Sequence, residues 1–125
     1  MNCWLSPLKL WNNDTTLRVF IKQTDLNPAP GSSQTWVFID ENPDAIDDAY
    51  FVCDPSMPNS WVNVPATYHS GSGGISFADG HAEIKRYHDG KVLAYNDPNG
   101  GWINLSAADN KTDLLWLQQR TTALK

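Results

Sequence analysis

The chain has 125 residues, of which 41% are hydrophobic and six are tryptophan, enough for one small domain with an apolar core. Nine Lys and Arg against fourteen Asp and Glu give a net charge of −5, and the basic residues are scattered, which argues against nucleic acid as a partner. No apolar run approaches the roughly 18 residues of a membrane helix, and the first residues lack the order of a signal peptide. We therefore expect a soluble chain with no membrane partner and no targeting signal.

The first quarter of the chain has weak periodicity. Residues 1–13 mix Trp and Leu with a proline and predict irregular structure. Residues 15–26 fit either a strand or a short helix, because β-branched residues occur together with a helical spacing of apolar ones. Two prolines and Gly31 predict a loop over residues 27–34.

Two apolar runs follow and predict strands. Residues 35–40 (TWVFID) are typical of a buried central strand, and residues 49–54 (AYFVCD) predict a second strand. Between them, residues 41–48 (ENPDAIDD) predict an acidic turn. Three prolines in residues 55–66 argue against regular pairing over any length.

The clearest local pattern is a β-hairpin over residues 74–87. Apolar and small residues alternate in its first strand, and Asp79-Gly80 is a pair typical of a type I′ turn. In the returning strand, Ala82 and Ile84 share one face.

The last third predicts one more turn and a helix. Residues 89–90 (Asp-Gly) indicate the turn, and residues 106–125 show apolar residues at helical spacing, with Ser106 or Asp109 as the expected cap. The whole pattern predicts an α+β fold with a small antiparallel sheet, the hairpin at 74–87 and a C-terminal helix.

Four ionisable side chains lie close together in the hairpin segment: His69, Asp79, His81 and Glu83. They can be interpreted as a metal site or as the His-Asp centre of a small hydrolase acting on esters, lactones or glycosides. The alternative is architectural: Asp79 shapes the turn, His69 returns to bond it, and His81 and Glu83 face solvent. We favour the architectural interpretation, because the sequence has neither HExxH spacing nor a GxSxG elbow.

Five carboxylates gather around the acidic turn: Asp40, Glu41, Asp44, Asp47 and Asp48. Oxygen-rich loops suit Ca²⁺, and calcium is the cofactor that this turn suggests. The spacing of an EF-hand is absent, however. A solvated acidic turn is the interpretation that we favour.

The cysteines and tryptophans leave alternatives open. Cys3 and Cys53 are too distant in sequence for a CxxC motif and can form either one disulfide or two reduced, half-buried thiols. The six tryptophans suit the core of a small domain, and one or two at a surface groove remain an alternative.

Nine residues separate His69 from Asp79-Gly80, and the block HSGSGGISFADGHAEIKRY resembles the signature of the H-X9-DG prepilin-type family of pseudopilin-like proteins. Residues 36–51 (WVFIDENPDAIDDAYF) are similar to the strand and acidic turn that precede this signature. PATYH resembles the approach to its histidine, and residues 112–121 (TDLLWLQQRT) resemble the tryptophan-bearing C-terminal helix.

The resemblance implies a noncatalytic head domain of a type II secretion or type IV pilus-like subunit, in which His69, Asp79 and Gly80 are a structural motif. It implies sister pilin-like subunits or a secreted protein as partners, and a periplasmic or cell-surface location for the full-length family member. Major pseudopilin heads often bind calcium in a C-terminal loop. Family members begin with a leader and a hydrophobic helix that this sequence lacks, so we expect the head alone.

Overall fold

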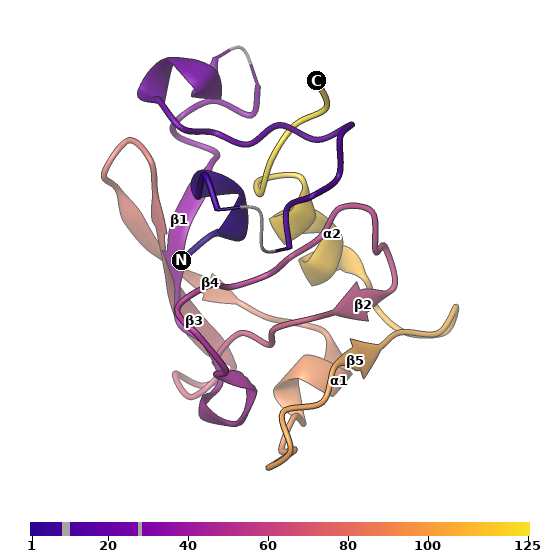
Figure 1. Ribbon diagram of the computed structural model, residues 1–125. Coiled ribbons are helices and arrows are strands. Elements are labelled where there is room, and N and C mark those ends of the chain that lie inside the picture. Colours follow the sequence, from indigo (N-terminus) through magenta and orange to yellow (C-terminus); the bar gives the residue numbers. More distant parts are fainter. Residues whose placement is uncertain (9–10, 28) are drawn as a thin grey trace.

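The computed structural model describes residues 1–8, 11–27 and 29–125, and it has the α+β fold that the sequence predicts (Figure 1). Three antiparallel strands form the main sheet in the order β1-β3-β4, and β2 pairs with β5 in a second, two-stranded sheet. The strands are β1 (Trp36–Ile39), β2 (Ser60–Trp61), β3 (Ser72–Phe77), β4 (Ala82–Arg86) and β5 (Ile103–Asn104). The helices are the 3₁₀ turns η1 (Cys3–Leu5), η2 (Gln23–Leu26) and η3 (Pro43–Ala45), and the α-helices α1 (Gly90–Leu93) and α2 (Thr112–Gln118).

The predicted hairpin is formed by β3 and β4, but its turn differs from the prediction. Gly80 has a φ of 97°, whereas Asp79 keeps a negative φ, so the type I′ assignment is wrong. The amide of Gly80 donates to Phe77 O at 3.0 Å, and the amide of Phe77 donates to His81 O at 2.9 Å. This is a three-residue loop that ends in a left-handed glycine.

Strand β1 lies at the edge of the main sheet rather than at its centre. A bulge between Trp36 and Phe38 turns the first side chain into the core and leaves the second 59% exposed. The outer edge of β1 is covered by Asn2, whose amide donates to Val37 O at 2.8 Å and whose Nδ2 donates to Trp36 O at 3.0 Å. The predicted strand is therefore correct, but its central position is wrong.

Residues 49–54 are largely buried, yet they form no strand beyond one parallel bridge between Phe51 and Asn2. The amide of Val52 donates instead to the side chain of Asn63, at 2.8 Å from Oδ1. The predicted second strand is wrong because its backbone bonds go to a single bridge and to Asn63, through the side chain and the amide of that residue, and do not continue as a ladder.

The helical segments are shorter than the sequence suggests. Residues 15–26 contain only the short η2 and an isolated bridge at Leu17, so neither a full strand nor an α-helix forms there. Ser106 and Asp109 do not cap α2, because they bond each other through Ser106 N and Asp109 Oδ2 at 2.6 Å. The first turn of α2 is instead bonded by Asn110, whose Oδ1 accepts from Thr112 N at 2.9 Å.

The apolar core lies between the inner face of the main sheet and α2. Trp36, Ile75 and Phe77 from the sheet cluster with Leu114 and Leu117 from the helix. A second cluster gathers the N-terminal segment against the buried middle of the chain: Cys3, Trp4, Leu17, Val52 and Val62. Neither cluster covers the outer face of the main sheet, which is exposed to solvent.

Both cysteines are buried free thiols, and burial raises the pKa of each. This corresponds to the reduced alternative for Cys3 and Cys53, although the thiols are fully rather than half buried. Among the described residues, no helix has the length and apolar character needed to cross a bilayer.

The glycine run before β3 has a packing reason at Gly73. A Cβ atom built on this residue would lie 2.6 Å from Ala66 O, closer than real contacts allow. We expect Gly73→Ala to lower the free energy of unfolding by at least about 1 kcal/mol, because backbone and sheet must move apart. Urea denaturation measures the change. The matched control is Gly90→Ala in α1, where no described atom other than those of the adjacent residues and the helix backbone lies within 4 Å of the added methyl group. Equal losses in the two variants would contradict the prediction.

Candidate functional site

Asp79 has the turn-shaping role that the sequence predicts. Its Oδ1 accepts from the amide of His81 at 3.1 Å and lies 2.6 Å from the ring Nδ1 of the same residue. The bond from the His81 amide, followed by the one from its side chain, lowers the pKa of Asp79. The His81 ring stacks on Phe77 with ring centroids 4.3 Å apart. Asp79 and His81 thus stabilise the hairpin turn at the protein surface.

His69 does not reach this turn. It precedes β3, whereas Asp79 follows it, and six extended residues separate two points by about 20 Å. His69 instead closes its own turn, with its amide donating to Ser72 O at 3.2 Å and its ring against Tyr68. The expected bond between His69 and Asp79 is therefore wrong, because β3 runs straight between them.

Glu83 faces solvent from the middle of β4, as expected. It lies opposite Ile75 in the register of the sheet, away from both ends of the hairpin. The four residues proposed for a hydrolytic or metal centre are therefore spread along the hairpin, and only Asp79 and His81 are brought together.

The acidic turn carries its carboxylates apart from one another. Asp40 Oδ2 accepts from Gly74 N at 2.8 Å across the sheet, and Asp48 Oδ1 accepts from Tyr50 N at 2.6 Å. In the described residues, no three of His, Cys, Asp and Glu are grouped so that they could hold a metal ion. The set proposed for calcium, Asp40, Glu41, Asp44, Asp47 and Asp48, is thus not assembled as a ligand shell.

Glu41 is the most perturbed carboxyl of this region. Burial, reinforced by the nearby negative charges of Asp47 and Asp48, raises the pKa of Glu41 to about 7, although a bond with Asn63 opposes the shift. Its Oε1 is buried and has no hydrogen-bond partner among the described residues. The sequence marks this residue only as one of several acids, because burial of the turn depends on the fold.

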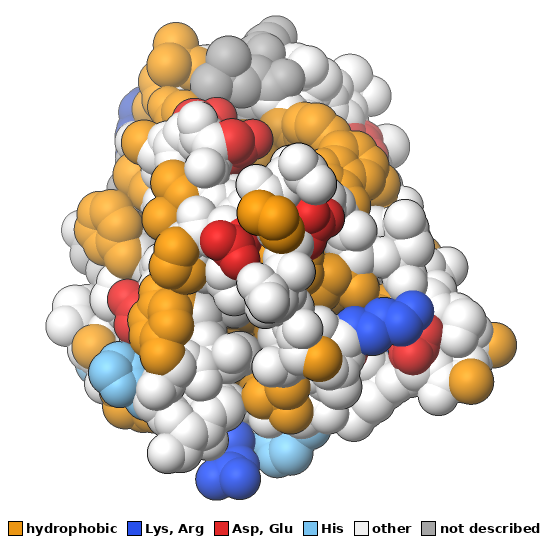
Figure 2. Space-filling model, turned by 90° about the horizontal axis from the view of Figure 1, so that it is seen from below, with side chains coloured by type: hydrophobic (Ala, Val, Ile, Leu, Met, Phe, Trp, Pro, Cys, Tyr) orange, Lys and Arg blue, Asp and Glu red, His pale blue; other side chains and the backbone are white. Residues whose placement is uncertain are grey.

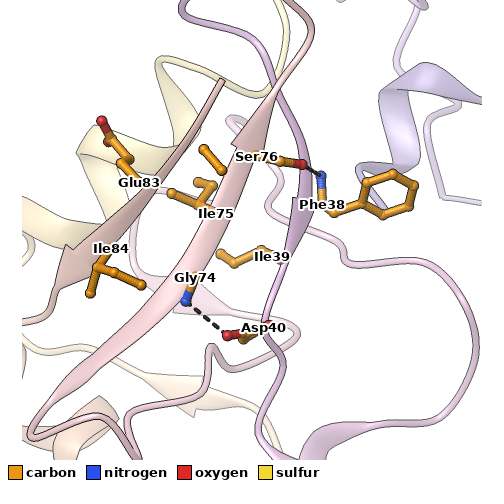
Figure 3. A pocket seen from close by; sticks show the side chains of 9 residues that line it. Phe38, Ile39, Asp40, Gly74, Ile75, Ser76, Glu83 and Ile84 are labelled. Carbon is orange, nitrogen blue, oxygen red and sulfur yellow. Dashed lines mark hydrogen bonds between the residues drawn. The ribbon is translucent and has the colours of Figure 1, made fainter. Parts of the chain in front are cut away.

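The outer face of the main sheet is a feature that the sequence analysis missed. A hollow of about 330 Å³ lies on it, and Figure 3 shows Phe38 and Ile84 on either side of β3 with Gly74 and Ser76 between them. Phe38 is 59% exposed and Ile84 is 68% exposed. The small residues leave the hollow, and the two large ones form its apolar sides.

Ala82 and Ile84 share a face as predicted, but that face points to solvent rather than to the core. They lie opposite Ser76 and Gly74, on the side of the sheet away from α2. An alternating pattern shows which residues share a face and does not show which face the core will cover.

Strand β4 has a free edge. The amide of Phe77 donates to His81 O, and the amide of Tyr87 donates to Gly71 O. Because bonded and non-bonded pairs alternate along an antiparallel ladder, every second residue of β4 between these two pairs bonds β3, namely Glu83 and Lys85. The backbone groups of Ala82 and Ile84 therefore point away from β3. Within the described chain, no hydrogen bond from another segment reaches them.

Comparison with family models, with curated proteins and with solved structures finds no match for the chain. The class of protein is therefore defined by fold and surface alone. It is an α+β domain with a three-stranded antiparallel sheet that packs on a helix with one face and exposes apolar side chains on the other.

Proposed function

We propose that this chain is a noncatalytic pilin-type head domain that binds sister subunits in a secretion or pilus-like assembly. The observation that carries the proposal is the free edge of β4 beside an exposed apolar sheet face. Unpaired edge strands and exposed apolar patches are typical of surfaces that join proteins. The resemblance of the block from His69 to Gly80 supplies the kind of assembly. A hydrolase has less support, because its proposed residues are not gathered at one site.

A second copy of this chain fits the free edge. When two β4 strands pair antiparallel about a two-fold axis at Ile84, this residue lies opposite its own counterpart and Ala82 lies opposite the partner's Arg86. These are the positions whose backbone groups point away from β3. The pairing satisfies those of Ala82 and Ile84, adds a second donor to Arg86 O, which already accepts from Lys85 Nζ at 2.7 Å, and joins the exposed Ile84 side chains of the two copies.

Charge selects this register over its neighbours. Pairing about Ile84 places Glu83 opposite the partner's Lys85, whereas pairing about Glu83 or Lys85 places like charges opposite each other. Glu83 has no ion pair within the described chain, and Lys85 already bonds Asp113 at 2.7 Å. Glu83 of one copy would thus extend an existing ion pair of the other.

We expect Ile84→Cys to form a disulfide-linked dimer under mild oxidation. Directly opposed residues of this pair type have Cα atoms about 5.5 Å apart, within the range of a disulfide. Nonreducing gel electrophoresis and intact mass measure the product, and the native thiols do not compete because both are buried.

Ala82→Cys is the matched control, because this exposed residue lies on the same strand and face, yet its two copies are about 13 Å apart in the proposed register. Adding Glu83→Lys to Ile84→Cys should slow crosslinking roughly tenfold by placing lysines opposite each other in both symmetric pairs. Equal crosslinking of Ile84→Cys and Ala82→Cys would contradict the register, and a strictly monomeric Ile84→Cys would contradict self-association.

A further inference from the structure

A second hollow, of about 230 Å³, lies on another part of the surface and has a different chemistry. Its floor is apolar and belongs to the N-terminal core cluster. Three aromatic side chains, Trp11, Tyr50 and Trp102, form its sides, and the carboxylates of Asp47 and Asp48 also line it. These residues come from three separate stretches of the chain that the fold brings together.

The aromatic sides are held in place before any ligand arrives. The rings of Trp11 and Trp102 meet edge to face, with centroids 5.5 Å apart and planes inclined by 76°. Trp11 Nε1 donates to Asp54 Oδ2 at 3.2 Å. Tyr50 Oη lies in hydrogen-bond contact with Ser6 Oγ at 3.0 Å. Both tryptophans nevertheless keep exposed surface, 37% for Trp11 and 48% for Trp102.

The hollow is negatively charged. None of the residues that line it is Lys or Arg, and neither Asp47 nor Asp48 has an ion pair in the described part of the chain. The nearby positive charge is the N-terminal ammonium of Met1, which interacts electrostatically with Asp48 and donates to Ala49 O at 2.9 Å. These two carboxylates contribute to the raised pKa of the neighbouring Glu41, after burial as the main cause. Figure 2 shows the molecule from below. On the face seen there, acidic side chains lie among hydrophobic ones near the centre, and Lys and Arg lie nearer the margin.

We propose that this hollow binds a small organic ammonium ion. Ring faces attract an alkylated ammonium group by cation–π interaction, and carboxylates beside the rings add direct charge attraction. The apolar floor suits the alkyl groups of such a cation, and the volume restricts the ligand to a small head group. An anionic ligand would be repelled. A neutral sugar would stack on the rings and donate hydroxyl hydrogen bonds to the carboxylates, but it carries no charge to balance theirs. This site is separate from the β4 edge and does not depend on the proposed assembly.

The first test compares choline with its neutral isostere 3,3-dimethyl-1-butanol, by calorimetry and by the shifts of tryptophan indole N–H signals in NMR spectra. We expect choline to bind at least about tenfold more tightly, because only the cation gains from the rings and the carboxylates. Equal affinity for the two compounds, or binding of neutral monosaccharides in preference to choline, would overturn the proposal.

Two variants place the binding in this hollow. Trp102→Ala should weaken choline binding about tenfold, and Asp48→Asn should weaken it severalfold while its side-chain oxygen still accepts from Tyr50 N. Asp44→Asn is the matched control, because Asp44 belongs to the same acidic turn and does not line the hollow. The half-exposed position of Trp102 makes its loss tolerable for the fold, which thermal unfolding checks. Unchanged choline affinity in folded Trp102→Ala, or equal losses of affinity in Asp44→Asn and Asp48→Asn, would contradict the assignment of the binding site to this hollow.

Discussion

Replacing Asp113 by Asn is expected to lower the free energy of unfolding by about 3 kcal/mol, the largest effect anticipated for a single polar residue of this chain. Asp113 is 1% exposed and lies at the start of α2. It accepts from Lys85 Nζ at 2.7 Å and from the amides of His88 and Asp89. An asparagine retains one acceptor, but its amide group faces donors and leaves the charge of Lys85 uncompensated.

The bonds around Asp113 join the hairpin to the rest of the core. Asp89 N donates to Asp113, and Asp89 Oδ2 in turn accepts from the buried Nε1 of Trp61 at 3.0 Å. Asp89 Oδ1 also accepts from Lys91 N in the first turn of α1. The carboxylate of Asp113 therefore connects β4, α1 and α2, and its loss weakens all three together.

Protonation of Asp113 at low pH should also destabilise the protein. Burial disfavours its charged form, but the bonds from Lys85, His88 and Asp89 outweigh burial and lower the pKa of Asp113 below its usual 3.8. This stabilisation is present above the unfolded pKa and is lost as pH falls through the lower folded value. Urea denaturation from pH 7 to pH 2 measures it, with the surface pair variant Asp109→Asn as control. A loss no larger in Asp113→Asn than in Asp109→Asn would contradict this role.

Local patterns made the hairpin predictable. The alternation of residues 74–87 and the Asp79-Gly80 pair act over a few positions, so they predicted the strands and the turn-shaping role of Asp79. The turn type was missed because Asp79 N donates to Ser32 O, a partner from a distant loop. The sequence pattern carries no information about that contact.

Nonlocal pairing explains the other differences. The run at 35–40 is apolar enough for a central strand, yet Asn2 covers its outer edge and no further strand from the described residues joins there. The run at 49–54 is similarly apolar, but the amide of Phe51 donates to Met1 O and that of Val52 to the side chain of Asn63, so no ladder forms there. Hydrophobicity predicted the burial of Trp36 and of residues 51–53, but it did not predict the exposure of Phe38 or specify the partners of either run.

The candidate surfaces were beyond sequence reasoning for the same reason. Ile84 is exposed because the fold places Gly74 beside it and the helix on the opposite side of the sheet. Trp11, Tyr50 and Trp102 are far apart in sequence, so their shared hollow follows only from the fold. Composition did indicate that one or two of the six tryptophans could lie at a surface groove, and two of them do.

Glu41 supplies a test of opposite sign, in which removing a charge stabilises the protein. Because the folded pKa of about 7 exceeds the usual 4.5, the folded state holds the proton more tightly than the unfolded chain. The stabilising contribution is complete below about pH 4.5 and is lost as pH rises through about 7. Glu41→Gln, which cannot ionise, should therefore match the wild type near pH 4.5 and exceed its stability at pH 8.

We expect this difference to reach about 2 kcal/mol at pH 8, after allowance for solvent screening of a half-buried group. Urea denaturation of both proteins between pH 4.5 and pH 8 gives the difference at each pH, which cancels the titration of groups common to both. Asp44→Asn, an exposed carboxylate of the same turn, is the control and should show no such growth. A constant difference between Glu41→Gln and wild type across this range would mean that Glu41 ionises as freely in the folded protein as in the unfolded chain, and would remove the buried-carboxyl interpretation.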